Sequence, residues 1–280
     1  MDLIFISNNI QQIELADQSG VDYVMIDLEI NGKVERQGHL NTLISNHSQE
    51  DIKLAKSILK NSKLMVRINP IHENSEEEID LCIRYGAETL MLPMFTTEDE
   101  VCKFIGYVAN RARVCLLLET GGALARAEQI LNVPGIDELH IGLNDLHLSL
   151  GLTFMFELIS GGLVDHISNL CQQKGLKFGI GGIARLGTGL LPAELILAEH
   201  IRLGSSQVIL SRDFKVLLED DNLSVNNAFK AEIDKLRGSE KFLKRSSAEY
   251  LNEQHGKLVE IVNQVVQVRL NPNLNNGYER

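Results

Sequence analysis

The 280-residue sequence has no tryptophan, few aromatic residues and no long hydrophobic run. Its longest apolar runs, such as residues 114–118, are a handful of residues long, whereas a helix that crosses a bilayer needs about 20. We therefore expect no membrane-spanning segment and no membrane partner. The first ten residues, MDLIFISNNI, lack the basic start of a secretory signal, which predicts a cytoplasmic protein.

Cysteine is also scarce, and the four cysteines are scattered without a Cys-x-x-Cys pair. This pattern disfavours a zinc finger, and a chain of this length does not need disulfides to be stable. We expect reduced thiols at Cys82, Cys102, Cys115 and Cys171.

Positive charge is in the minority, because 27 basic residues face 38 acidic ones and the net charge is −11. No cluster of Lys and Arg is interleaved with aromatic residues, so we expect no nucleic-acid partner. The composition, 44% hydrophobic and 23% charged, is that of an ordinary globular protein with room for one large core or two modest ones.

Short runs rich in Val, Ile, Leu and Met recur along the chain and predict eight strands. Most runs lack polar alternation, which favours parallel strands covered on both faces by helices. The predicted strands are Leu3–Ser7, Asp22–Glu29, Lys63–Asn69, Thr89–Phe95, Arg113–Glu119, Glu138–Asp145, Lys177–Ile183 and Gln207–Arg212.

Helical segments separate these runs. At three predicted helix starts, a hydroxyl N-cap residue is followed by acidic residues in the first turn. At three predicted helix ends, a glycine just before the next strand can adopt the left-handed backbone conformation of a helix C-cap. The starts are at Ser48, Ser75 and Thr97, and the glycines are Gly20, Gly86 and Gly175.

Eight strand–helix repeats within about 215 residues predict an α/β fold, a (β/α)8 TIM barrel over residues 1–215. The competing doubly wound open sheet would have a glycine-rich turn after its first strand. The chain has Ser7, Asn8 and Asn9 there.

Residues 216–280 exceed what one closing helix requires. Helical spacing at residues 228–237 and 247–268 predicts two C-terminal helices, the second with an apolar stripe through Leu251, His255, Leu258 and Val262. We expect this extension to make a subunit contact, and we expect the polar tail from Asn271 to be frayed.

Active sites of such barrels lie at the carboxyl ends of the strands. Polar residues end four of the predicted strands: Asp27 and Glu29, Arg67 and Asn69, Glu119 and Thr120, and Asn144 and Asp145.

Glu119 and Asp145 end neighbouring strands, where two carboxylates would repel unless a cation lies between them. Two protein carboxylates, with water or substrate oxygens completing the shell, is a set that Mg²⁺ or Mn²⁺ accepts. Arg67 would then present its planar fork to a substrate carboxylate. The alternative is that Arg67 forms a buried salt bridge with Glu119 or Glu29 and binds no ligand.

Several segments resemble the 4-hydroxy-2-oxoheptanedioate aldolase and citrate lyase beta-subunit family, in the same order and with similar spacing. They are YVMIDLE (23–29), LMVRINP (64–70), GAETLMLPMFTTEDEV (86–101), LLLETGGAL (116–124), ILNVPGIDELHIGLNDL (130–146) and SLG (149–151).

This resemblance, over roughly residues 3–215, implies a phosphoenolpyruvate/pyruvate-type barrel with Mg²⁺ or Mn²⁺ on Glu119 and Asp145. It implies a 2-oxo acid that chelates the ion while Arg67 holds its carboxylate, helped by the backbone around Gly142 to Asp145, with Gly142 and Asn144 as substrate-binding residues. It also implies a homo-oligomer, a trimer or hexamer, in which the last barrel helix is exchanged between subunits.

A metal on the keto and carboxylate oxygens of pyruvate stabilises the enolate, which predicts a carbon–carbon lyase of the class II pyruvate aldolase type. A Schiff-base aldolase would need a lysine at an inner strand end. Lys63 and Lys177 begin their strands, and Lys33 and Lys215 lie beyond theirs, so this mechanism is disfavoured.

The chain departs from the family at Ile30, where the aldolase branch has a proton-moving His and the citrate lyase branch an Asp, and at Leu117, where the aldolase branch has Gln. Two alternatives therefore stay open: a citrate-lyase-like acyl-CoA lyase, and a non-catalytic barrel that keeps metal and 2-oxo acid binding.

Replacement bases are available on nearby loops. His39 and His47 lie in the long loop after the second strand, His72 follows the third strand and His147 follows Asp145. We assign catalytic roles to Arg67, Asp27, Glu29 and His47.

The glycine-rich end of the seventh strand, residues 179–185, and Arg212 form a second feature. Barrels often bind phosphate here, so Arg212 or Arg185 would hold a phosphate or second carboxylate of the substrate. The alternative is that the glycines fit the narrow barrel interior.

Overall fold

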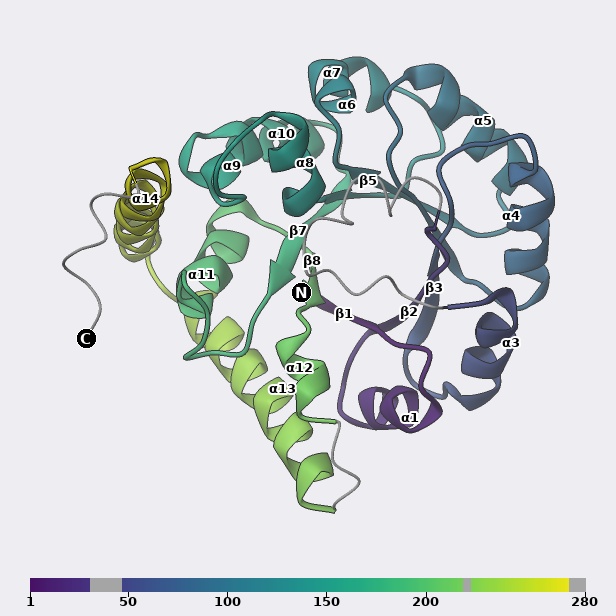
Figure 1. Cartoon of the computed structure of the whole chain (residues 1–280), viewed down its shortest axis with the longest axis horizontal. Coiled ribbons are helices and arrows are strands. Elements are labelled where there is room, and N and C mark those ends of the chain that lie inside the picture. Colours follow the sequence, from purple (N-terminus) through teal and green to yellow (C-terminus); the bar gives the residue numbers. More distant parts are fainter. Residues whose placement is uncertain (31–46, 219–222, 272–280) are drawn as a thin grey trace.

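The structure, a computed structural model, describes residues 1–30, 47–218 and 223–271. Eight parallel strands close into a barrel in chain order, which confirms the TIM-barrel prediction (Figure 1). The strands are β1 (Asp2–Ile6), β2 (Tyr23–Asp27), β3 (Lys63–Arg67), β4 (Thr89–Leu92), β5 (Arg113–Leu118), β6 (Glu138–Ile141), β7 (Lys177–Ile183) and β8 (Gln207–Leu210).

Helices surround the barrel on its outside (Figure 1). The described helices are α1 (Ile10–Gln18), α3 (Gln49–Ile58), α4 (Ser75–Arg84), α5 (Glu98–Val108), α6 (Gly121–Ala125), α7 (Ala127–Ile130), α8 (Leu143–Ser149), α9 (Glu157–Ser160), α10 (Leu163–Gln173), α11 (Ala193–Leu203), α12 (Asp213–Val216), α13 (Leu223–Leu243) and α14 (Ala248–Leu270). Ser48 and Thr97 cap α3 and α5 as expected, whereas α4 starts one residue early with Asn74 as its N-cap.

Side chains of the strands alternate between two cores. On β2, Val24 and Ile26 pack outward against the helices, whereas Tyr23 and Met25 point into the barrel. Met65, Met91, Cys115 and Leu117 fill the same interior layer. Because successive strand residues point to opposite faces, the next inward positions above this layer lie at the carboxyl end of the barrel.

Several predicted strands are too long at their carboxyl ends. The largest error is at β6, which ends at Ile141, so Asn144 and Asp145 lie on α8 rather than on a strand. The apolar run continues past the strand end because Leu143 and Leu146 form the buried face of that helix. Arg212 likewise lies beyond β8, at the N-cap of α12.

The two C-terminal helices pack on their own chain. α14 lies outside the barrel alongside α11 and α9 (Figure 1). Leu258 and Val262 are fully buried, and His255 Nδ1 lies 3.0 Å from the buried carboxylate of Glu199 on α11. The apolar stripe is therefore covered without another subunit, and the subunit contact stays a prediction. The tail from residue 272 lies outside the described residues.

The four cysteines are free thiols, and Cys82, Cys115 and Cys171 are buried. None of the helices in the described ranges is both long and apolar enough to cross a membrane.

Candidate active site

The polar residues at the carboxyl end continue the inward-facing rows of the barrel. Asp27 follows Tyr23 and Met25 on β2, Arg67 follows Met65 on β3, and Glu119 follows Cys115 and Leu117 on β5. Asp27 and Arg67 are direct partners in the pairing of β2 with β3. Strand register therefore brings these side chains to one mouth.

Arg67 is fixed by a bidentate ion pair with Asp27. Its Nε and Nη2 donate to the two Asp27 carboxylate oxygens, each at 2.8 Å, and its Nη1 lies 3.5 Å from Glu29. Burial alone would lower the pKa of Arg67, but the charges of Asp27, Glu29 and Glu119 and the Asp27 hydrogen bonds raise it. Arg67 thus remains charged, with the donors of Nη1 facing away from the Asp27 pair.

This pairing differs from the alternative that the sequence left open. The buried salt bridge of Arg67 is chiefly with Asp27, with Glu29 further away, and Glu119 acts on it only through its charge. The ion pair with Asp27 therefore fixes the orientation of the Arg67 guanidinium. It uses two of the five N–H groups that an arginine carries.

Glu119 is a buried carboxylate whose surroundings disfavour its charged form. It is 3% exposed, and its Oε1 accepts a hydrogen bond from the Met94 backbone N–H at 3.1 Å. Burial raises the pKa of Glu119 to about 8; Arg67 opposes the shift, and the charges of Glu29 and Asp145 add to it. A cation beside this carboxylate would remove that penalty.

Glu119 lies against the start of α8, where Gly142 is the N-cap. A Cβ at Gly142 would come within 2.9 Å of both Cβ and Oε2 of Glu119, so only glycine leaves this carboxylate in place. Asp145 lies in the first turn of α8, partly exposed, and Asn144 beside it is exposed.

The donor set fits a hard divalent cation that keeps some ligands from water or substrate. Asp27, Glu29, Glu119 and Asp145 lie at this end with Arg67, and the charges of Glu29 and Asp145 disfavour the charged form of Glu119. Within the described ranges no three His, Cys, Asp or Glu side chains converge as a complete metal site. Two carboxylates plus non-protein oxygens is the arrangement that Mg²⁺ tolerates.

His47 returns to the mouth as a hydrogen-bond acceptor for the backbone. The Asp27 N–H donates to His47 Nδ1 at 2.9 Å, and the ring is 8% exposed. An imidazole that accepts at Nδ1 carries its proton on Nε2, so His47 acts as a donor toward other groups. It can take up a proton only by giving up the Asp27 bond.

The other sequence candidates for the base lie elsewhere. His39 falls outside the described residues. His72 Nε2 is 2.9 Å from the Glu78 carboxylate, and His147 is buried with its Nδ1 on the Leu143 carbonyl within α8. Ile30 is 51% exposed and contributes no acid–base group.

Packing accounts for two glycines of the β7 region. A Cβ at Gly179 would lie 2.4 Å from His140 Nδ1, and one at Gly181 would lie 2.8 Å from the Leu143 side chain. Just beyond β7 and β8, the buried Nε of Arg185 and Oγ of Ser211 have no hydrogen-bond partner among the residues that the structure describes. Both groups can donate a hydrogen bond to an anion.

Lys215 is the residue at this end that the sequence reasoning set aside. It lies on α12, is half-buried and interacts electrostatically with Asp27 and Arg212. Sequence reasoning considered it only as a Schiff-base lysine on a strand. The sequence signal for its place at the mouth is that Lys215 follows Arg212 by three residues, directly after the last strand.

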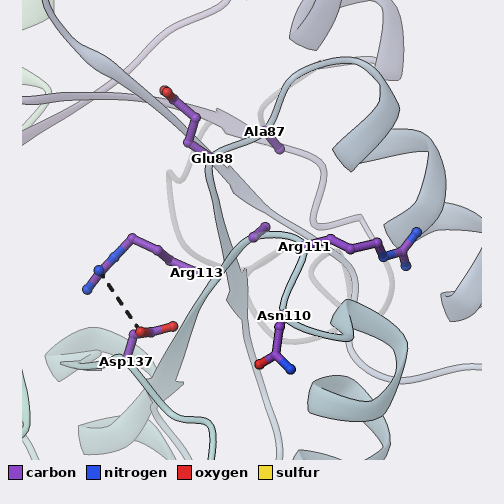
Figure 2. Close-up of a pocket in the computed structure, with 7 residues that line it drawn as sticks. Ala87, Glu88, Asn110, Arg111, Arg113 and Asp137 are labelled. Atoms are coloured by element: carbon purple, nitrogen blue, oxygen red, sulfur yellow. Dashed lines mark ion pairs between the residues drawn. The ribbon is translucent and has the colours of Figure 1, made fainter.

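A hollow of about 480 Å³ lies at the opposite end, where β4 and β5 begin (Figure 2). Arg113 there pairs with Glu138 at 2.7 Å and lies 4.0 Å from Asp137, while Arg111 pairs with Asp80. Its charges are thus compensated, and active sites of this fold lie at the other end.

The sequence profile of the HpcH/HpaI aldolase/citrate lyase family matches residues 3–157, more than half of the chain. The chain belongs to this family. Membership makes it a lyase of the aldolase/citrate lyase type, as the sequence motifs imply. The matched segment contains Asp27, Glu29, Arg67, Glu119 and Asp145.

Solved structures of the family share the fold. An HpcH/HpaI aldolase from Desulfitobacterium hafniense DCB-2 is 13% identical with a TM-score of 0.57, and the alignment covers 88% of this chain and 93% of that one. An HpcH/HpaI aldolase/citrate lyase family protein from Burkholderia cenocepacia J2315 is 17% identical with a TM-score of 0.60, with coverage of 85% and 94%. No curated protein sequence matches the chain. At these identities the structural likeness concerns the fold.

Proposed function

We propose that the protein is a divalent-metal-dependent carbon–carbon lyase of the class II pyruvate aldolase type. It would cleave or form an aldol adduct of a 2-oxo acid through an enolate. The observation that carries this proposal is the buried carboxylate of Glu119, whose charged form is disfavoured by burial and by the charges of Glu29 and Asp145, and for which Gly142 leaves room. Glu119 and Asp145 would hold Mg²⁺ or Mn²⁺.

The substrate's 2-oxo acid head would bind beside this pair. Arg67, oriented by Asp27, would donate from Nη1 to a substrate oxygen. The Gly142 N–H already donates to the Leu118 carbonyl, so the N–H groups of Leu143 and Asn144 would face the substrate carboxylate. A distal phosphate or carboxylate would bind near Arg212. When bound, the cation would supply charge stabilisation of the enolate oxygen, worth several kcal/mol.

The remaining residues of the site hold Arg67 in place and keep water out of the barrel interior. Glu29 donates its N–H to Asp27 Oδ1 at 3.3 Å and holds the far side of Arg67. The interior layer below the mouth, which contains Met25, Met65 and Leu117, is buried and apolar. Electrostatic interactions at the mouth are therefore stronger than in water.

Deuterium exchange into the methyl group of pyruvate tests this proposal. The full-length protein is incubated in D₂O with pyruvate and either Mg²⁺ or Mn²⁺, and exchange is followed by ¹H NMR. We expect exchange that EDTA abolishes and that added metal restores. Glu119→Gln should lose it, whereas Glu253→Gln, an exposed change on α14, should not. Metal-independent exchange, or none, contradicts the proposal.

A non-catalytic barrel is the second candidate. It is favoured by Ile30 at the family's proton-transfer position and by the tautomer of His47. This candidate predicts normal binding of Mn²⁺ and pyruvate without exchange. A citrate-lyase-like activity would instead require a thioester, so cleavage of adducts with and without CoA separates it from the aldolase.

We also propose a cytoplasmic homo-oligomer, a trimer or hexamer, without nucleic-acid or membrane partners. Sedimentation of the purified protein measures the subunit number. A monomer at micromolar concentration would contradict it.

A further inference from the structure

We infer that Lys215 is the group that takes the proton from the substrate's reacting carbon, replacing the base that Ile30 lacks. This inference rests on the proposed function and adds a catalytic residue to it. It follows from the place of Lys215 in the fold and from the charges around it.

The fold brings α12 to the same mouth as Asp27. β8 pairs with β1, and β1 pairs with β2, so the end of β8 is two strands from the end of β2. α12 begins three residues after β8, and its Phe214 is buried. Lys215, the next residue, is half-buried and interacts with the Asp27 charge on β2.

Asp27 does not neutralise Lys215 by a direct contact. Both Asp27 oxygens accept from Arg67 at 2.8 Å. Among the residues that the structure describes, none forms an ion pair with Lys215 Nζ within 4 Å, and Arg212 and Asp27 act on it through their charges. Burial of a charged amine without an ion pair costs free energy, so this position disfavours the charged form of Lys215.

The environment favours the neutral amine. Burial lowers the pKa of Lys215, the positive charge of Arg212 at the N-cap of α12 lowers it further, and Asp27 from β2 opposes the shift. A lysine becomes an effective base when burial and neighbouring cations bring its pKa toward the working pH. His47 cannot fill this role without losing its bond to the Asp27 amide.

The step balances within the site. The neutral Nζ accepts a proton from the methyl carbon of pyruvate, the C–H electron pair moves to the enolate, and Nζ becomes an ammonium. The reverse transfer returns a proton, or a deuteron after solvent exchange, to the same carbon. In cleavage of an adduct, the amine takes the hydroxyl proton as the carbon–carbon bond breaks, and the ammonium then protonates the enolate.

Two other roles of Lys215 make different predictions. A lysine that only binds an anion would be replaceable by arginine. A lysine that forms a Schiff base would be trapped covalently by borohydride in the presence of pyruvate.

The test uses methyl exchange of pyruvate in D₂O with Mn²⁺. We compare wild type with Lys215→Met, Lys215→Arg and Lys215→Ala, and with Lys103→Met, an exposed lysine change on α5. We expect the exchange rate of each Lys215 variant to fall by roughly 10²- to 10⁴-fold. The affinities for Mn²⁺ and pyruvate, measured by calorimetry, should stay within about threefold of wild type, because the amine transfers a proton and does not bind either ligand. Ethylamine should restore exchange to Lys215→Ala. Lys103→Met should match wild type.

The outcomes are distinct. Exchange retained in Lys215→Arg, or a borohydride adduct on Lys215, overturns the base assignment while leaving the proposed function intact. Exchange retained in Lys215→Met also overturns the base assignment and leaves the proposed function intact. If wild type itself shows no exchange, the proposed function fails and the assignment fails with it. Loss of Mn²⁺ or pyruvate binding in the variants would show a binding role and would also overturn the assignment.

Discussion

Gly142→Ala tests whether the position of the Glu119 carboxylate is set by the start of α8. The backbone angles at Gly142, φ −82° and ψ 87°, do not require glycine, so the effect is purely steric. The added Cβ would lie 2.9 Å from Cβ and Oε2 of Glu119 and 3.2 Å from Leu117 Cδ1. Carbon atoms in contact prefer about 3.5–4.0 Å.

The magnitude follows from overpacking. Extra atoms in a packed site cost about 1–3 kcal/mol. If Glu119 moves to relieve the contact, the metal-dependent exchange rate should fall by roughly 5- to 150-fold, since about 1.4 kcal/mol is a factor of ten. If instead the barrel absorbs the strain, the melting temperature should fall by roughly 2–12 °C.

The assay follows both quantities. Melting is measured by circular dichroism, because the chain has no tryptophan for intrinsic fluorescence, and exchange is measured by NMR with saturating Mn²⁺. Gly106→Ala is the matched control, because nothing lies within 4 Å of its added Cβ on α5. If Gly142→Ala leaves both the melting temperature and the exchange rate unchanged, the start of α8 does not set the position of Glu119.

Two further predictions concern stability. Asp27→Ala removes the bidentate partner of Arg67 and should cost about 3 kcal/mol in urea unfolding, whereas Asp234→Ala, in an exposed pair, should cost under about 1 kcal/mol; equal losses would contradict this. Burial lowers the pKa of His140 to about 4 and that of His200 to about 3. As the pH falls below about 6.5, these histidines are therefore protonated in the unfolded chain but not in the folded one. The free energy of unfolding should fall between about pH 6.5 and 4, and it should fall less in His200→Gln than in wild type. An equally steep fall in both proteins would mean that burial of His200 does not cause it.

Much of the barrel could be predicted from local sequence. Each run of Val, Ile, Leu and Met marks a strand, because strands covered on both faces need apolar side chains throughout. The Asp27–Arg67 pair lies in such runs, at their last inward positions. Once β2 and β3 pair in parallel register, Asp27 and Arg67 lie opposite each other, and their contact follows from the register alone.

The ends of elements and long-range contacts could not be predicted in this way. The hydrophobic run predicts that Asp145 lies on a strand, because such a run does not show where a strand ends and a helix begins. His47 contacts the Asp27 amide across a 20-residue separation, and no local pattern encodes that return. The burial of Leu258 against the chain's own barrel depends on how α14 folds back, which its helical spacing does not specify.

Anomalous diffraction from crystals soaked with Mn²⁺ and pyruvate would show whether Glu119 and Asp145 hold the cation together with the 2-oxo acid. We predict one strong manganese peak within about 2.5 Å of a carboxylate oxygen of each residue, with pyruvate oxygens completing its shell beside Arg67. A manganese peak elsewhere, or no peak at this mouth at saturating Mn²⁺, would mean that these two carboxylates are not the metal ligands.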